Sequence, residues 1–344
     1  MKHSHVLVTG GSGFIAGHCI LELLGQGYSV RTTVRSPDKE AAVRSALEDA
    51  GMAHSDRLSF TAANLADDAG WTEAASDVEF VLHVASPVQP GYVRSESELI
   101  APAREGTLRV LRAARDAGVR RVVLTSAFHA VGWGHPRRNH AFTESDWTNI
   151  DGPGVDAYGK SKTLAERAAW DFVSSGAGAM ALTTMLPVAV MGPVLGKEIT
   201  GSNHLIQLML AGRMRALPDL HVPIVDVRDV AKAHVQAMTN LRAAGERFLL
   251  SSGRALSMTE IATILKTEFG GAAGKVPTRL APSLALRIAS FFNPVVRGIL
   301  PDLGYAKKVS HEKATGLLNW IPRDSTEALV AAAESMIRKG LIDA

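Results

Sequence analysis

Cysteine is almost absent from this sequence, because its 344 residues contain only Cys19. A single cysteine cannot form a disulfide within the chain, so a small disulfide-stapled fold is excluded. This usage favours a reducing compartment, and we expect a cytoplasmic protein.

Long apolar runs and blocks of one charge are also missing. The most apolar stretch, residues 280–300, is interrupted by Arg287, Pro294 and Arg297, so we expect a helix packed on the protein and not a bilayer span. No signal-like segment precedes the first apolar strand, and no membrane association is expected. The formal net charge is only +3 and the basic residues are dispersed, which disfavours nucleic acid as a partner.

Strand-like and helix-like patterns alternate through the first two thirds of the chain. The expected strands are short and rich in β-branched residues, whereas the segments between them have helical spacing and end near glycines. Nearly continuous apolar strands joined by helical crossovers predict a doubly wound α/β fold with a parallel sheet. The expected strands are Val6–Thr9, Val30–Val34, Leu58–Ala62, Phe80–Val84, Val119–Thr125 and Leu182–Val190.

The alternation weakens after Gly192, and helices broken by prolines dominate the last third of the chain. We therefore predict two bodies, each assembled from separated pieces of the chain. The sheet body is expected to comprise residues 1–192 and 226–253, and a smaller lobe residues 193–225 and 254–344.

The first strand runs directly into the glycine-rich sequence Thr9-Gly-Gly-Ser-Gly-Phe-Ile-Ala16 and an amphipathic helix. Glycines let the backbone approach a pyrophosphate, and the free N–H groups at the helix start bind it. Gly11, Gly13 and Ala16 satisfy the dinucleotide-binding pattern, although we prefer the frame Gly10, Gly13 and Ala16. The contacts predicted here come from Thr9, Gly10, Ser12, Gly13, Phe14 and Ile15.

The end of the second strand discriminates between the two nicotinamide dinucleotides. An acidic residue there would bind the ribose 2′-hydroxyl of NAD, whereas a cation would bind the 2′-phosphate of NADP. Arg35 stands at this position and Lys39 follows, while Asp38 falls in the turn. A guanidinium matches a phosphate well, so we expect NADPH, with NADH the less favoured cofactor.

A Tyr-x-x-x-Lys pattern begins the helix that follows the fifth expected strand. Tyr158 and Lys162 are four residues apart and so share one helical face. Reduction of a carbonyl group builds negative charge on its oxygen, which a phenol can protonate, and a nearby ammonium group is expected to lower the pKa of that phenol. A hydroxyl on the facing strand, for which Ser126 is our candidate, can hydrogen-bond the same oxygen.

These motifs together resemble the extended short-chain dehydrogenases, in the branch of dihydroflavonol, cinnamoyl-CoA and aldehyde reductases. The resemblance spans nearly the whole chain and also rests on His83-Val-Ala-Ser-Pro87, Val225-Asp-Val-Arg-Asp-Val-Ala231 and Asn319-Trp-Ile-Pro-Arg323. It implies a Rossmann domain with a substrate-binding lobe, NADPH-dependent reduction of an aldehyde or ketone, and catalytic roles for Tyr158 and Lys162. Besides these two residues, it assigns to the cofactor site Asn64, Leu65, Val84, Ala85, Ser86, Pro187 and Val188.

The chain departs from this family at three positions. Ala127 stands where members of this family have a second, catalytic serine. Neighbours on a strand point to opposite faces, so Ser126 can replace that serine only if the backbone shifts. The alternative sources of the hydrogen bond are Thr125 and a water molecule held by another side chain. Leu186 precedes Pro187 where asparagine is usual, and Asn64 replaces an aspartate beside the adenine. These changes leave the fold intact and alter the expected contacts to the cofactor.

The substrate side is defined by proximity in sequence to the catalytic motifs. The residues expected there are Ser86, Phe128, His129, Trp133, Met191 and His204. Trp133 and Met191 could equally belong to the core, and the interpretation of His129 and His204 as surface or hydrogen-bonded histidines is favoured over a catalytic one. No histidine has metal-ligand spacing, so no metal is expected. Asp226 and Asp229 are interpreted as a helix cap and ion-pair partners of Arg228.

The expected partner is a small carbonyl compound, and the sequence is compatible with a monomer or a homodimer. A sugar-nucleotide epimerase or dehydratase that holds NAD is the alternative enzyme, but Arg35 argues against it. A non-catalytic protein that senses NADP is the second alternative, and the retention of Tyr158 and Lys162 argues against that. Fold alone fixes neither substrate nor stereochemistry.

Overall fold

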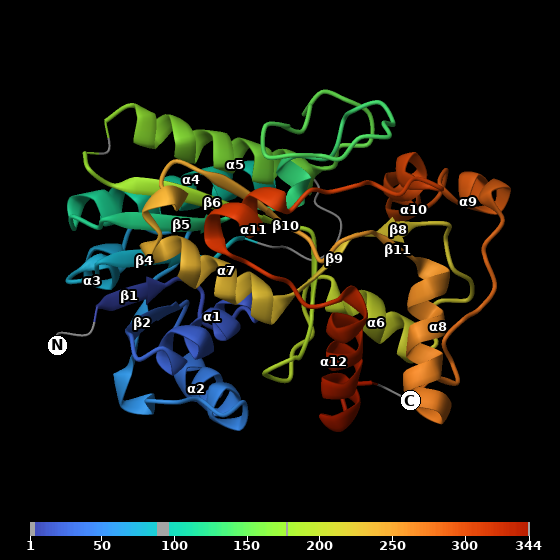
Figure 1. The fold of residues 1–344 in the computed structure, drawn as a ribbon, viewed down its shortest axis with the longest axis horizontal. Helices are drawn as coiled ribbons and strands as arrows, with labels where there is room; N and C mark the ends of the chain where they lie inside the picture. Colours follow the sequence, from blue (N-terminus) through green and yellow to red (C-terminus); the bar gives the residue numbers. More distant parts are fainter. Residues whose placement is uncertain (1–3, 88–95, 177, 343–344) are drawn as a thin grey trace.

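A seven-stranded parallel sheet forms the centre of the structure, a computed structural model that describes residues 4–87, 96–176 and 178–342 (Figure 1). Its strands are β1 (His5–Val8), β2 (Ser29–Val34), β3 (Leu58–Ala62), β4 (Phe80–His83), β5 (Arg121–Thr125), β6 (Ala181–Pro187) and β10 (Arg247–Leu250). They lie in the order β10-β6-β5-β4-β1-β2-β3. The order reverses between β1 and β4, which places a ligand crevice beyond the carboxyl ends of these strands. The expected doubly wound fold is confirmed.

Alternate residues of each strand supply two apolar layers. Val6 and Val8 pack with the helices of one face, whereas Leu7 between them packs with those of the other. The first face is covered by α1 (Phe14–Gly25), α2 (Lys39–Asp49) and α7 (Val227–Thr239), and the second by α3 (Trp71–Ala75), α4 (Ser97–Asp116) and α5 (Ala157–Ser174). Burial on both faces explains why the strands are nearly continuous in apolar residues.

A separate apolar cluster lies beside the sheet, at the opposite end of the view from the N-terminus in Figure 1. It is built by side chains of α6 (Asn203–Leu210), α8 (Met258–Phe269) and α12 (Ser325–Arg338). A two-stranded sheet of β8 (His221–Val222) and β11 (Leu256–Ser257) borders it. By contrast, α11 (Glu312–Leu318) and Trp320 pack in the cluster of the main sheet, so residues 254–344 contribute to both cores.

Two sequence expectations about individual elements are corrected. The expected strand Leu182–Val190 is divided into β6 and β7 (Ala189–Met191), because the chain leaves the main sheet after Pro187 and β7 pairs with β9 (Ile224–Asp226). Residues 280–300 form two short helices, α9 (Ser283–Ala289) and α10 (Pro294–Ile299), and expose Phe291 and Phe292 by 76% and 86%. No helix in the described parts of the chain is long and apolar enough to cross a membrane.

Candidate active site

The glycine turn between β1 and α1 has the geometry of an anion cradle. Gly10 has a φ of +74°, and a Cβ there would lie 3.0 Å from the Cβ of Ala85. A Cβ on Gly11 would lie 2.4 Å from the Thr32 hydroxyl oxygen, so side chains are excluded at both positions. Gly13 caps α1 without a side-chain hydrogen bond. The amides that begin this helix are left for a ligand, and the cradle therefore fits the pyrophosphate of a dinucleotide.

Thr9 ties the cradle to the loop after β4. Its hydroxyl oxygen accepts the amides of Val84 and Ala85 at 3.1 and 3.0 Å, and it lies 2.9 Å from Nδ1 of His83. Both lone pairs of the hydroxyl are thus used, so its proton is donated to Nδ1. The loop that carries Val84, Ala85 and the half-buried Ser86 is fixed beside the glycine turn.

The residues expected at the adenosine end lie at the tips of β2 and β3. Arg35 and Lys39 are exposed, and no described carboxylate lies within ion-pair distance of Arg35. Asn64 is also exposed, and its side-chain oxygen accepts the amide of Ala66 at 3.1 Å. Leu65 beside it is half-buried. An unpaired guanidinium at the tip of β2 fits a ribose 2′-phosphate.

Tyr158 and Lys162 lie in the first turns of α5, beside the end of β5. Asp156 caps this helix by accepting the amide of Gly159 at 2.7 Å. The ammonium group of Lys162 lies 5.9 Å from the centre of the Tyr158 ring and 3.5 Å from the carbonyl oxygen of Thr125. The cap and the helical spacing thus bring phenol and ammonium onto one face, as expected for a Tyr-x-x-x-Lys pair.

The pKa of Tyr158 moves in the direction opposite to our expectation. Burial raises the pKa of Tyr158 to about 12, and the negative charge of Asp156 adds to this. Burial also lowers the pKa of Lys162 to about 8, against the opposing effect of Glu166. In the protein alone the phenol is therefore held in its protonated, proton-donating form at neutral pH.

Ser126, our candidate for the second hydroxyl, is held by a buried carboxylate instead. Its hydroxyl donates to Glu166 of α5 at 2.7 Å, and both residues are buried. Glu166 also accepts hydrogen bonds from Thr184 at 2.8 Å and from Arg247 at 2.8 Å. The Ser126 hydroxyl is therefore part of a buried polar network centred on Glu166.

Thr125 has an equally complete environment on the other face of β5. Its hydroxyl lies 2.7 Å from Nε2 of His234, whose Nδ1 lies 2.7 Å from the carbonyl oxygen of Val230. Because that carbonyl can only accept, Nδ1 carries the proton and Thr125 donates to Nε2. Thr125 therefore points toward α7, away from the α5 face that carries Tyr158.

Apart from Ser86, which lies half-buried in the loop after β4, the residues expected on the substrate side separate into three groups. Phe128 and Met191 are buried in apolar clusters, which corrects their placement because proximity in sequence does not set side-chain direction. His204 is exposed on α6 and lies 2.8 Å from Gln207. His129 and Trp133 are half-buried; the His129 ring meets the Tyr158 ring edge-on with 4.9 Å between centroids, and Trp133 stacks on His129.

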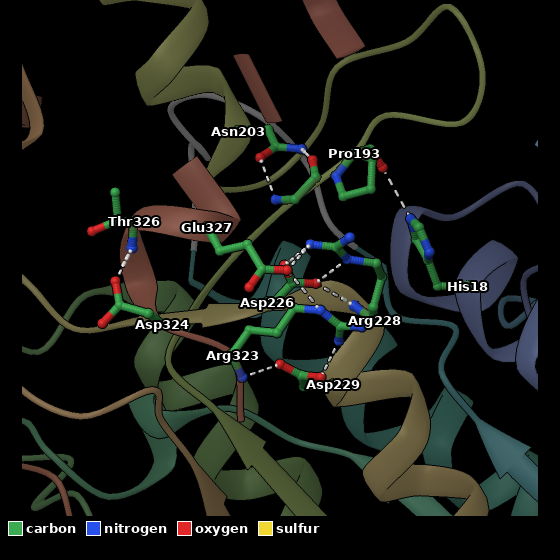
Figure 2. A network of polar contacts seen from close by, with 11 residues as sticks. His18, Pro193, Asn203, Asp226, Arg228, Asp229, Arg323, Asp324, Thr326 and Glu327 are labelled. Atoms are coloured by element: carbon green, nitrogen blue, oxygen red, sulfur yellow. Dashed lines mark hydrogen bonds and ion pairs between the residues drawn. The ribbon is translucent and has the colours of Figure 1, made fainter. Parts of the chain in front are cut away.

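Asp226 caps α7 and pairs with Arg228 as we expected, whereas Asp229, also expected to pair with Arg228, pairs with Arg323 instead. Arg228 lies 2.7 Å from Asp226 and 3.4 Å from Glu327. Figure 2 shows these two pairs beside the pair of Arg323 and Asp229. Because Glu327 belongs to α12, this network joins the sheet body to the helical cluster. Its contacts are those of a structural network.

Sequence reasoning missed Glu166, the centre of the buried network. The spacing Tyr158, Lys162, Glu166 places all three on one face of α5, so the helical period could have revealed it. Its partners Thr184 and Arg247 come from β6 and β10, which only the folded chain brings together.

The chain is similar in sequence and in structure to known reductases. The chain is 35% identical over 266 residues to the cinnamoyl-CoA reductase CAD2 of Medicago truncatula, covering 76% of this chain and 79% of that protein. It is 32% identical over 332 residues to a Vitis vinifera anthocyanidin reductase, covering 90% and 96% of the two chains. Yeast methylglyoxal/isovaleraldehyde reductase Gre2, solved with NADPH, superposes with a TM-score of 0.79 at 26% identity and covers 98% of this chain and 100% of its own.

Such a sheet, with a glycine-lined helix start and a Tyr-x-x-x-Lys pair at its carboxyl edge, defines a nicotinamide-dependent oxidoreductase. The model of the NAD dependent epimerase/dehydratase family matches residues 6–250. The chain belongs to this family, and among its relatives are the reductases that its motifs resemble.

Proposed function

We propose that the protein reduces an aldehyde or ketone to an alcohol with NADPH, and that Tyr158 protonates the carbonyl oxygen. The observation that carries this proposal is the Tyr158–Lys162 pair at the carboxyl edge of the sheet, next to a cradle that fits a dinucleotide. The reductases among the relatives, and the NADPH complex of the yeast neighbour, support the same direction and cofactor.

Tyr158 and Lys162 have different roles in the proposed reduction. NADPH, when bound, supplies the hydride. The phenol of Tyr158, protonated at neutral pH, donates a hydrogen bond to the substrate oxygen and transfers its proton as negative charge develops there. Lys162 places a positive charge beside this phenol and favours the phenolate that remains.

The half-buried His129 ring borders the phenol and the Trp133 ring stacks on His129, and these two rings favour an apolar carbonyl compound over a sugar nucleotide. We assign substrate binding to the lobe of residues 193–225 and 254–344, together with these two rings. The cluster formed by α6, α8 and α12 supports that lobe.

The direct test is NADPH consumption by the purified protein across aldehydes, α-diketones, β-ketoesters and aromatic ketones. We expect substrate-dependent oxidation of NADPH with stoichiometric formation of the alcohol. A protein that binds NADPH tightly and consumes none across the panel would favour a non-catalytic binding protein.

Arg35→Ala is expected to raise the KM for NADPH about 10- to 100-fold and to leave the KM for NADH nearly unchanged. The reason is the loss of one charge-assisted hydrogen bond, worth about 1.5–3 kcal/mol, to a phosphate that NADH lacks. Steady-state kinetics with both cofactors measure the effect, and Lys232→Ala, on α7, is the matched control. An equal loss with both cofactors would remove Arg35 from the phosphate contact.

The pH profile is expected to follow Lys162. With its pKa lowered to about 8 by burial, Lys162 is charged below that pH and neutral above it, while Tyr158 stays protonated because its pKa is raised to about 12. Hence kcat/KM for reduction should be flat near neutral pH and fall as pH rises through about 8. Lys162→Arg, whose charge does not titrate, should have lower activity without this alkaline decline. A decline that persists in Lys162→Arg would assign it to another group.

A further inference from the structure

The site lacks one expected hydrogen-bond donor. The resemblance to the reductases implies a catalytic hydroxyl at position 127, where this chain has Ala127 and so offers no hydroxyl to the substrate oxygen. Neither neighbouring hydroxyl replaces it, because Ser126 donates to Glu166 and Thr125 to His234. The chemistry still favours a second donor, since two donors stabilise a developing oxyanion better than one.

His129 is the polar side chain that the fold brings against Tyr158. It lies in the 3-10 turn η2 (Phe128–Ala130), which directly follows the end of β5. Its ring meets the Tyr158 ring at 76°, with 4.9 Å between the centroids, and both side chains are half-buried. Among the described residues the hydrogen bonds of His129 and Tyr158 involve their backbone carbonyls, so the imidazole nitrogens and the phenol oxygen are each open to a ligand.

The His129 ring is held in place by an aromatic and ionic stack. It lies parallel to Trp133 with 4.0 Å between centroids, and Lys307 covers the indole ring, with its ammonium nitrogen 3.7 Å from the indole centroid. Lys307 is paired with Asp302 at 2.7 Å. The backbone is fixed too, because Thr148 donates its hydroxyl to the His129 carbonyl at 2.7 Å and accepts the Trp133 amide at 3.1 Å. A donor fixed in this way has little freedom to lose when a substrate binds.

The imidazole is neutral at working pH. Burial lowers the pKa of His129 to about 4, and the nearby charges oppose one another: Asp156 and Asp302 raise the pKa, whereas Lys307 and Lys162 lower it. A neutral imidazole carries one N–H donor and one lone pair. It can therefore donate a hydrogen bond to an oxygen without competing with Tyr158 as the source of the proton.

We propose that His129 is a catalytic residue, whose N–H donates the second hydrogen bond to the carbonyl oxygen in place of the hydroxyl absent at Ala127. This inference rests on the proposed function, and it adds no covalent step. Tyr158 transfers the proton, while His129 keeps its own and stabilises the negative charge that builds on the oxygen beforehand.

The test uses two substitutions of His129, which separate the effect of the aromatic ring from the effect of the N–H donor. His129→Phe keeps an aromatic ring against Trp133 and removes both nitrogens, whereas His129→Gln keeps an N–H donor and loses the ring. We expect kcat/KM for a good carbonyl substrate to fall about 10²–10³-fold in His129→Phe and much less in His129→Gln, with NADPH affinity unchanged in both.

Ala127→Ser in the His129→Phe background is the rescue variant. It places a hydroxyl at the position that the family resemblance assigns to a catalytic serine, and we expect it to recover much of the lost kcat while the thermal midpoint of unfolding stays the same. Wild-type kcat/KM in His129→Phe, or equal losses in His129→Phe and His129→Gln without rescue, would overturn the role. Absence of carbonyl reduction in the wild-type protein would instead contradict the proposed function, so the two failures are distinguishable.

Discussion

Tyr158→Phe is expected to reduce kcat by about 10²–10⁴-fold, the contribution of a well-placed general acid. The substitution removes one oxygen and leaves the ring against His129 and beneath Lys162. The phenol of the wild-type protein is protonated at neutral pH, so its loss leaves the alkoxide without a proton donor in the site. Stopped assays of NADPH consumption and of alcohol formation measure the effect.

NADPH affinity separates this result from a general loss of structure. The cradle of residues 9–16 does not depend on the phenol oxygen, so the dissociation constant for NADPH should change little. Tyr28→Phe is the matched control, because Tyr28 lies directly before β2 and packs against the core of the sheet; this variant should leave kcat unchanged. Tyr158→Phe with wild-type turnover would exclude the phenol as the proton donor.

Glu166→Ala is expected to lower the free energy of unfolding by about 3–5 kcal/mol, because it leaves a buried guanidinium without its counterion. Glu166 is fully buried and Arg247 is 8% exposed, and the carboxylate also accepts from Ser126 and Thr184. Denaturant titration measures the loss. Glu105→Ala, which breaks an exposed pair with Arg104, should cost less than about 1 kcal/mol. Comparable losses in the two variants would contradict the buried network.

The same network sets the expectation for Ser126. Ser126→Ala removes a hydrogen bond to a charged acceptor and should lower stability by about 1.5–3 kcal/mol. Its effect on kcat should be small, because the hydroxyl points to Glu166 and not to the substrate oxygen. A loss of turnover as large as that of Tyr158→Phe, at unchanged stability, would return Ser126 to the catalytic role that the sequence suggested.

Features encoded by nearby residues were predictable from the sequence. The strands, the glycine turn and the Tyr158–Lys162 pair each depend on spacings of a few residues, and the doubly wound parallel sheet was predictable from the alternation of strands and helices. The cap at Asp226 was predicted for the same reason.

Side-chain direction at the end of β5 was not predictable in this way. Ser126 and Thr125 are neighbours on a strand and point to opposite faces, but which partner captures each hydroxyl depends on α5, α7 and β10. Phe128 and Met191 were assigned to the substrate side on sequence proximity alone, and packing across the core placed them elsewhere.

The sequence by itself determined the sheet, the dinucleotide cradle and the phenol–ammonium pair, because periodicity and turn chemistry are local properties of the chain. The tertiary structure alone decided which polar groups are hydrogen-bonded within the protein and which remain available to a substrate. A hydroxyl's partner, a phenol's pKa and the position of His129 depend on burial and on contacts between residues far apart in sequence, and these exist only once the layers have packed.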